Sequence, residues 1–258
     1  MNLPTVFITG ATSGFGQAAA RCFGHEGYQL VLTGRRKERL NALADELSQD
    51  CDIHIATIDV RDAEDVKAVI EQLPEQFKNI EILINNAGLA LGASPANEAS
   101  LDDWHTMIDT NVTGLVNVTH ALLPILLEQP KATIINLASI ASNWCYPGAH
   151  VYGASKAFVA QFSRNLRSDF AGTGLRITSL EPGLSESEFS LVRFNGDQDK
   201  YNQIYDGTNP LQPEDIADIM LWIAEQPSHI NINSLEVMPT SQAWDNFKIV
   251  KAPSIKAC

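Results

Sequence analysis

Residues 5–16 read TVFITGATSGFG and place a glycine-rich turn directly after a short apolar run. The run is rich in β-branched and aromatic residues, which favour a strand, and a helical pattern follows the turn. The three glycines let the backbone turn tightly and approach a pyrophosphate, while the helix start presents free N–H groups. Such turns also serve ordinary strand-to-helix connections, but the position between a first strand and a first helix favours dinucleotide binding.

The same alternation of strand and helix continues along the chain. Apolar runs predict further strands, at 29–33, 53–58, 80–84, 133–137, 176–180 and 234–238. Helical patterns separate them, and a long one at 101–127 contains Asn111 and Gly114, which weaken a helix and therefore indicate a local purpose. About six alternations indicate an α/β fold in which helices cover both faces of a parallel sheet.

Composition limits the classes of function. The chain has 258 residues, of which 45% are hydrophobic and 19% charged, and this suits one large globular domain. Its net charge of −13 argues against a nucleic-acid partner and against an anionic membrane surface. The cysteines show neither a metal-ligand spacing nor a disulfide framework: Cys22, Cys51, Cys145 and Cys258. With no leader and no segment of transmembrane length, we expect a cytoplasmic protein without a metal.

The candidate chemistry lies in the middle of the chain. Ser139 ends an apolar run, and a Tyr-x-x-x-Lys pair, Tyr152 and Lys156, follows it. If the segment from residue 151 is helical, both side chains of the pair share one face, and we expect the ammonium to lower the pKa of the phenol. Ser139 would donate a hydrogen bond to a carbonyl oxygen. The set suits carbonyl reduction or alcohol oxidation, although a Tyr–Lys pair alone also occurs by chance on exposed helices.

The second strand is followed by Arg35 and Arg36, where a site for NAD usually has an acid. An arginine there accommodates the 2′-phosphate of NADP, and we favour Arg35 for this contact over Arg36; the same stretch also reads as a solvated helix start. Asp59 ends the third strand and either accepts a hydrogen bond from an adenine amino group or caps the helix near Asp62.

Two further stretches suggest a ligand site. Residues 85–88 put amides and small side chains at the carboxyl end of the fourth strand, where open α/β sheets bind ligands. Residues 184–213 lose the regular alternation, and we expect an irregular lid or binding loop there.

These stretches together resemble the short-chain dehydrogenase/reductase family along nearly the whole chain. Its motifs occur in the family's order: Thr9-Gly10-x-x-x-Gly14-x-Gly16, Asp59-Val60, Asn85-Asn86-Ala87-Gly88, Asn111, Ser139, Tyr152-x-x-x-Lys156 and Pro182-Gly183. The resemblance implies one Rossmann-type, doubly wound domain over residues 1–258. It also implies that Tyr152 is the general acid/base, that Ser139 positions the carbonyl, that Lys156 lowers the tyrosine pKa and holds the nicotinamide ribose, and that Asn111 supports a proton-relaying water.

The predicted site follows from these matches. The catalytic set is Asn111, Ser139, Tyr152 and Lys156. The predicted cofactor contacts are Gly10, Thr12, Ser13, Gly14, Phe15, Gly16, Arg35, Arg36, Asp59, Val60, Asn86, Ala87, Gly88, Tyr152, Lys156, Pro182, Gly183 and Ser187. Two departures are visible: Ser13 stands where NADP-dependent members often have a basic residue, and Ser187 stands for the threonine that follows Pro-Gly.

Residues 86–92, 107–111 and 187–194 resemble a narrower group, the NADP-dependent 3-hydroxy acid dehydrogenases, which includes serine dehydrogenases and the bacterial malonic semialdehyde reductase. The resemblance implies NADP, a small 3-hydroxy acid as substrate and a homotetramer. Small diketones, keto esters or other aldehydes are the alternative substrates, and an NADP-binding sensor or scaffold is the alternative of another class.

Ser139, Tyr152 and Arg193 are the predicted substrate contacts. A small acid needs a group that binds its carboxylate, and Arg193 is the only arginine in the loop after Pro182-Gly183. The other interpretation of Arg193 is an ion pair with Glu186 or Glu188 that orders the loop.

Overall fold

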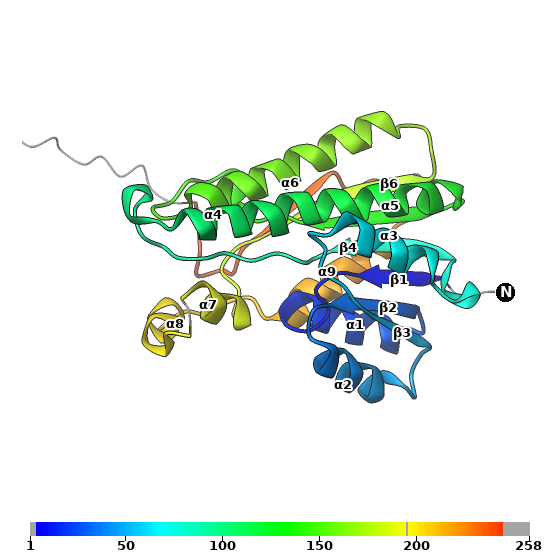
Figure 1. The fold of residues 1–258 in the computed structure, drawn as a ribbon. Helices are drawn as coiled ribbons and strands as arrows, with labels where there is room; N and C mark the ends of the chain where they lie inside the picture. The colour runs from blue at the N-terminus through cyan, green and yellow to red at the C-terminus, as the bar shows by residue number, and fades with distance from the viewer. Residues whose placement is uncertain (1–3, 195, 245–258) are drawn as a thin grey trace, which may run out of the picture.

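The computed structural model describes residues 4–194 and 196–244, and its centre is a seven-stranded parallel sheet with the order β3-β2-β1-β4-β5-β6-β7 (Figure 1). The strands are β1 (Thr5–Ile8), β2 (Gln29–Gly34), β3 (Ile53–Thr57), β4 (Ile80–Asn85), β5 (Ala132–Leu137), β6 (Leu175–Pro182) and β7 (Ser234–Val237). All seven predicted strands are confirmed. Because the strands are parallel, the residues that follow β1, β4, β5 and β6 meet at one edge of the sheet, where ligand sites of open α/β sheets form.

Helices cover both faces of this sheet, as predicted for a doubly wound fold. One face packs against α1 (Gly14–His25), α2 (Lys37–Leu47) and α9 (Pro213–Glu225), and the other against α3 (Ala63–Glu71), α5 (Gly114–Glu128) and α6 (His150–Asp169). In α2 the apolar residues Leu40, Leu43 and Leu47 recur on one face and are buried, while its charges face outward. Short 3₁₀ turns lie at Glu75–Phe77, Ala96–Glu98 and Ile140–Ser142.

A continuous helix of 28 residues, Leu101–Glu128, contains the predicted interruption. It consists of α4 (Leu101–Ile108), a π-helical turn (Asp109–Thr113) and α5. A side chain at Gly114 would collide with Val60, so this glycine lets the helix approach the end of the third strand. In the described part of the chain this helix alone is long and apolar enough to cross a membrane, so the expectation that no segment reaches that length is wrong. Val118, Leu122 and Leu126 of α5 are fully buried in the core beside the sheet.

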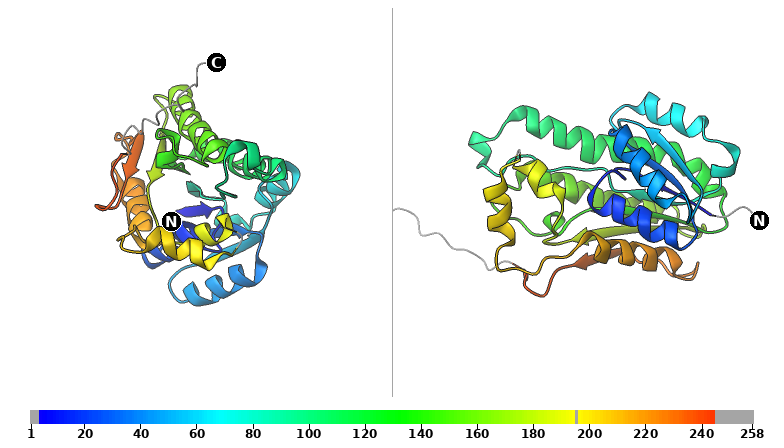
Figure 2. Two further views of the ribbon diagram at one scale, coloured as in Figure 1. Left: turned by 90° about the vertical axis from the view of Figure 1, so that its left-hand side faces the viewer. Right: turned by 90° about the horizontal axis from the view of Figure 1, so that it is seen from below.

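The segment of residues 184–213 follows β6, and we call it the lid throughout. It contains α7 (Glu188–Arg193) and α8 (Gln198–Tyr205), so the prediction of an irregular loop is wrong. Helices this short show too few turns for a periodic apolar pattern to be visible in the sequence. The two helices, drawn in yellow, lie at the end of the molecule where the strands end (Figures 1 and 2).

The described cysteines, Cys22, Cys51 and Cys145, are free thiols, and Cys258 lies outside the described residues. Burial raises the pKa of the Cys22 and Cys51 thiols to about 11, which keeps them protonated near neutral pH.

Candidate active site

Tyr152 and Lys156 lie one turn apart on α6 and face the same cleft. The helix begins at His150, which puts positions i and i+4 on one face as predicted. The Lys156 Nζ atom lies 6.0 Å from the centre of the Tyr152 ring. The two residues are only 9% and 6% exposed, so this is a buried pair and the chance pairing of exposed side chains is ruled out.

Ser139 completes the catalytic end of the cleft. It follows β5 directly, and its Oγ accepts a hydrogen bond from the Ala141 amide at 3.1 Å. Its hydroxyl also donates to the Pro182 carbonyl at 3.5 Å and lies close enough to Tyr152 to lower the pKa of the phenol. The strand end and the first turn of α6 therefore bring the serine hydroxyl and the phenol together.

The pKa of Tyr152 differs from the sequence-based expectation. Burial raises it, and the hydrogen bond from Ser139 and the positive charge of Arg193 oppose this only in part. The expected lowering by Lys156 is wrong for this arrangement, because the ammonium donates a hydrogen bond to the Leu137 carbonyl at 2.6 Å instead. Burial lowers the pKa of Lys156 to about 8. The phenol is therefore protonated and neutral at neutral pH.

The side chain of Asn111 holds the chain at Leu89, next to this pair, through hydrogen bonds. Its Oδ1 accepts from the Leu89 amide and its Nδ2 donates to the Leu89 carbonyl, both at 2.8 Å. The same Nδ2 donates to Ser155 Oγ at 3.0 Å, and Ser155 donates to the carbonyl of Tyr152. The π-helical turn aims the amide inward, which explains why the long helix is interrupted at this point. The proton-relaying water remains a prediction.

One long cleft runs from these residues to the end of β2, and the predicted cofactor contacts line it with the exception of Gly16. Gly16 does not line the cleft but is needed for the shape of the turn, because a side chain there would collide with Asn86 Nδ2 and with the carbonyl of Gly10. Gly10 adopts a φ of +67°, which favours glycine, and a Cβ atom there would lie 3.0 Å from Asn86 Nδ2. These glycines let the turn pack tightly against the end of β4.

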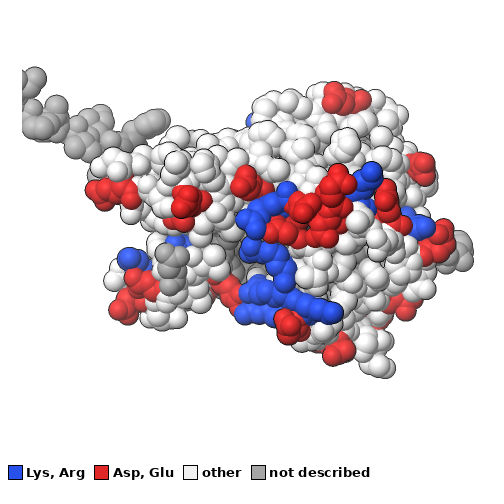
Figure 3. All heavy atoms as spheres, viewed as in Figure 1, with Lys and Arg blue, Asp and Glu red and all other residues white. Residues whose placement is uncertain are grey.

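The far end of the cleft is rich in arginine. Figure 3 shows Lys and Arg gathered in a band on this face, beside the lobe that α7 and α8 form. Arg35 lines the cleft, and within the described residues its guanidinium has neither a hydrogen bond nor an ion pair. Arg36 donates to Thr12 Oγ1 at 2.8 Å and to Ser13 Oγ at 2.8 Å, so its guanidinium lies against the turn that follows β1.

Asp59 is at the same end, and its carboxylate is held by Arg61. Hydrogen bonds from Arg61 hold the pKa of Asp59 below its ordinary value. The helix cap is Asp62, which accepts from two amides at the start of α3, so the capping alternative for Asp59 is wrong. Its contact with adenine remains a prediction.

Arg193 lies beside the catalytic residues but outside the set that lines the cleft. Its Nε donates to the Gly92 carbonyl at 3.1 Å and its Nη1 to the Tyr146 hydroxyl at 3.2 Å. Its guanidinium carbon lies 6.0 Å from the centre of the Tyr152 ring. The predicted alternative, an ion pair with Glu186 or Glu188, is wrong: Glu186 accepts from Tyr201, and Glu188 pairs with other arginines.

Comparison with known proteins now places the chain. The family model described as short chain dehydrogenase matches residues 4–195. The chain belongs to the short chain dehydrogenase family. It is therefore an oxidoreductase, and the family resemblance expected from the sequence is confirmed.

Relatives within the short chain dehydrogenases are similar over nearly their whole length. Sulfoacetaldehyde reductase 2 of Chromohalobacter salexigens is 58% identical over 245 residues, 95% of this chain and 97% of that protein. Serine 3-dehydrogenase of Agrobacterium fabrum is 51% identical over 247 residues, 96% of this chain and 98% of that protein. A solved structure, the closed form of serine dehydrogenase complexed with NADP+, has a TM-score of 0.93 at 47% identity and covers 96% of this chain and 100% of that chain.

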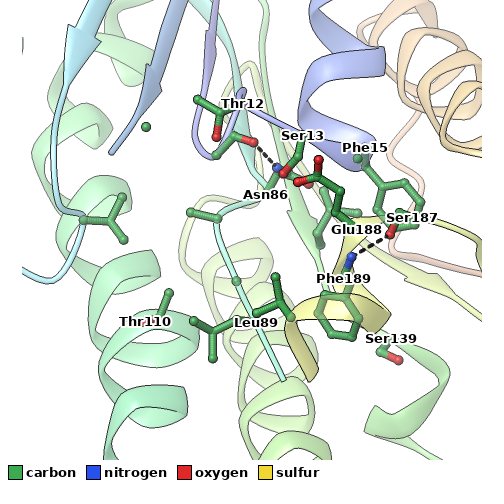
Figure 4. A pocket seen from close by; sticks show the side chains of 18 of the residues that line it. Thr12, Ser13, Phe15, Asn86, Leu89, Thr110, Ser139, Ser187, Glu188 and Phe189 are labelled. Atoms are coloured by element: carbon green, nitrogen blue, oxygen red, sulfur yellow. Dashed lines mark hydrogen bonds between the residues drawn. The ribbon is translucent and has the colours of Figure 1, made fainter. Parts of the chain in front are cut away.

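Some residues of the site were missed by sequence reasoning. Leu89 and Thr110 are two of them, and Figure 4 shows them along the cleft together with Phe189, and with Glu188 beside Ser13. Arg39 and Tyr146 were missed as well, although Arg39 is one helical turn beyond Arg36. The sequence held two signals for these residues: the spacing of Arg36 and Arg39 at the start of α2, and the position of Glu188 and Phe189 directly after Ser187.

Proposed function

We propose that this protein is an NADP-dependent oxidoreductase that transfers a hydride between nicotinamide and the 3-position of small 3-hydroxy acids. The observation that carries this proposal is a single cleft with two chemically different ends. Tyr152, Ser139 and Lys156 lie at one end, and free positive charge lies at the other. Such a cleft suits an elongated dinucleotide with a phosphate at one end and a reacting ring at the other.

The residues of the cleft fit NADP. Thr110 Oγ1 is buried without a hydrogen-bond partner among the described residues, and it lines the cleft. Arg35 is free to bind a 2′-phosphate, and the absence of a side chain at Gly88 leaves open the space beside Asn111 and Lys156. The related serine dehydrogenase was solved with NADP+. When bound, the cofactor supplies the hydride or accepts it.

The chain itself supplies the proton chemistry. Because burial raises the pKa of Tyr152, its hydroxyl is protonated and can donate to the carbonyl oxygen of a substrate during reduction. Ser139, whose hydroxyl lies beside Tyr152, donates to the same oxygen and fixes its position. In the reverse direction the tyrosinate removes the proton from the alcohol. Lys156 is charged below a pH of about 8, and from the family resemblance we propose that it holds the nicotinamide ribose.

Arg193 supports an anionic substrate. It is the arginine of the lid that lies beside Tyr152, and its guanidinium keeps N–H groups beyond those bound to Gly92 and Tyr146. The Phe189 ring packs 5.6 Å from the Tyr152 ring and excludes water from this end. A guanidinium with remaining donors in a partly apolar wall suits a small anionic group.

A sulfonate is the second candidate for that anionic group. Two sulfoacetaldehyde reductases of Chromohalobacter salexigens are 58% and 59% identical to this chain, closer than the serine 3-dehydrogenase at 51%. A short aldehyde with a sulfonate has the same charge and nearly the same spacing as a 3-oxo acid. Neutral aldehydes, diketones and keto esters, and a role as an NADP-binding sensor or scaffold, are the remaining alternatives.

The test is a panel of substrates that compares anionic compounds with a neutral one of similar size. L-Serine, 3-hydroxypropionate, 3-hydroxyisobutyrate, malonic semialdehyde and sulfoacetaldehyde are assayed with NADP(H) and NAD(H), next to a neutral aldehyde of similar size. We expect turnover of the anionic substrates with NADP(H), and the ratio of kcat/KM values decides between carboxylate and sulfonate. Absence of turnover with tight NADPH binding would favour the sensor.

The Arg193→Gln variant tests the anion contact. Loss of a charge-assisted hydrogen bond raises KM for anionic substrates by roughly tenfold or more, while KM for a neutral aldehyde changes far less. Equal losses on both would mean that Arg193 orders the lid through Gly92.

We further propose, from the family resemblance, that the enzyme is a cytoplasmic homotetramer. Phe158 on α6 and Trp222 on α9 are 38% and 50% exposed, as expected for side chains that a neighbouring subunit covers. Light scattering measures the molar mass in solution, and a mass other than that of four chains would contradict the tetramer.

A further inference from the structure

Glu188, the first residue of α7, joins the lid to two arginines at the arginine-rich end of the cleft, which we call the adenosine end because we propose that the adenosine of NADP binds there. Its carboxylate lies 2.8 and 2.9 Å from Arg39 Nη1 and 3.3 Å from Arg36 Nη1. Arg36 is itself bound to Thr12 and Ser13, in the turn after β1. The lid and the start of α2 therefore meet at one carboxylate, and Arg36 joins them to the turn after β1. Figure 4 shows Glu188 beside Ser13.

The neighbours of Glu188 touch the rest of the cleft. A Cβ atom on Gly14 would lie 3.6 Å from Ser187 Cβ, so the lid begins directly over the glycine-rich turn. The next residue on the other side, Phe189, packs against Tyr152. Consecutive residues of the lid thus contact both the phosphate-binding turn and the catalytic tyrosine, and the position of Glu188 determines how the lid covers both.

The arginines at this end have different tasks. Arg36 and Arg39 are occupied by the lid and by the turn, whereas Arg35 has neither a hydrogen bond nor an ion pair within the described residues. We infer that Glu188 is a positioning residue that latches the lid across the cleft through Arg36 and Arg39 and thereby controls the rate at which the dinucleotide leaves. This inference rests on the proposed NADP-dependent function.

The exposure of the latch matches a reversible role. The side chains of Arg36, Arg39 and Glu188 are 42%, 46% and 44% exposed, so water and salt weaken each ion pair. Such pairs hold a lid but let it open in every turnover. Opening of a lid limits the release of product in many enzymes.

The Glu188→Gln variant tests the latch in two independent measurements. Hydrogen exchange of the α7 amides, without cofactor, should be about three- to tenfold faster, because two exposed ion pairs are lost. Dissociation of NADPH, followed by stopped-flow fluorescence with an excess of non-fluorescent NADP+ that blocks rebinding, should be faster by a similar factor. Glu188→Asp should fall between the variant and the natural protein.

Glu186→Gln is the matched control, since Glu186 is in the same lid but pairs with Tyr201 and Gln212 rather than with an arginine. It should leave both α7 exchange and NADPH release unchanged. Combining Glu188→Gln with Arg39→Gln should speed the exchange no more than Glu188→Gln alone, because that change already removes the ion pair that Arg39→Gln removes.

Four outcomes overturn the latch: unchanged α7 exchange in Glu188→Gln, an equal effect of Glu186→Gln, additive effects in the double variant, or faster exchange with unchanged release. Slower release would overturn it as well, because the carboxylate would then compete with the cofactor phosphate for the arginines. The exchange measurement contains no cofactor, so it judges the latch separately. Failure of the natural protein to bind NADPH would instead reject the proposed function.

Discussion

The two ends of the cleft hold their polar groups in different ways. At the catalytic end, Tyr152, Lys156 and Asn111 are nearly or fully buried, and backbone groups hold the lysine and the asparagine. At the adenosine end, Arg36 and Glu188 are about half exposed and are held by other side chains. The first arrangement is held by buried hydrogen bonds, whereas the second consists of exposed ion pairs that water and salt weaken.

This difference has an energetic basis. A buried polar group that loses its partner costs about 1 to 3 kcal/mol, so the catalytic end tolerates few alternatives to its present geometry. An exposed ion pair contributes about 0 to 1 kcal/mol and can be exchanged for contacts with a ligand. Substitutions at the catalytic end should therefore act on kcat, and those at the adenosine end on affinity and release.

The largest expected effect is that of Tyr152→Phe. The variant keeps the ring packed against Phe189 but removes the transferable proton, so kcat should fall by a factor on the order of 10² to 10⁴. Fluorescence titration should give a Kd for NADPH close to that of the natural protein. A kcat near the natural value would break the comparison, because the rigid end would not then supply the proton.

Arg35→Ala comes next, and it sharpens the comparison at the adenosine end. A charge-assisted contact with the 2′-phosphate is worth roughly 1.5 to 3 kcal/mol, so Kd for NADPH should rise about ten- to a hundredfold while Kd for NADH is unchanged. Arg36→Ala is the matched control: it also loses the bonds to Thr12 and Ser13, so it should weaken both cofactors. If Arg35→Ala weakened both equally, Arg35 would support the turn instead.

The sequence predicted the catalytic end far better than the adenosine end. Tyr152 and Lys156 are four residues apart on one helix, and Ser139 follows a buried strand, so local periodicity places them. The strands were predicted for the same reason, since each is a buried apolar run. Sequence periodicity does not predict electrostatics. The raised pKa of Tyr152 could not be foreseen, because it depends on burial by the whole fold.

The contacts of the adenosine end join residues that no local pattern connects. Arg39 and Glu188 are 149 positions apart in sequence, and both are charged surface residues of a kind found on every exposed helix face. The helices of the lid are also too short to show a repeat. The ion pairs that close the lid could therefore be found only when the folded chain brought them together.

The smallest expected effect concerns stability, and it tests whether the catalytic end holds a destabilising charge. Burial lowers the pKa of Lys156 from 10.5 to about 8, so between these values the unfolded chain binds a proton that the folded protein has lost. The free energy of unfolding then rises with pH in this window, and the cost of the buried charge is fully present below a pH of about 8. Lys156→Met has no such group, while Tyr152 remains in both proteins and its contribution cancels. Urea unfolding at several pH values from neutral to alkaline should therefore show the natural protein gaining on the order of 1 kcal/mol over the variant. A difference that stays constant, or that falls as the pH rises, would show that the ammonium is well solvated and that the catalytic end is less rigid than its hydrogen bonds indicate.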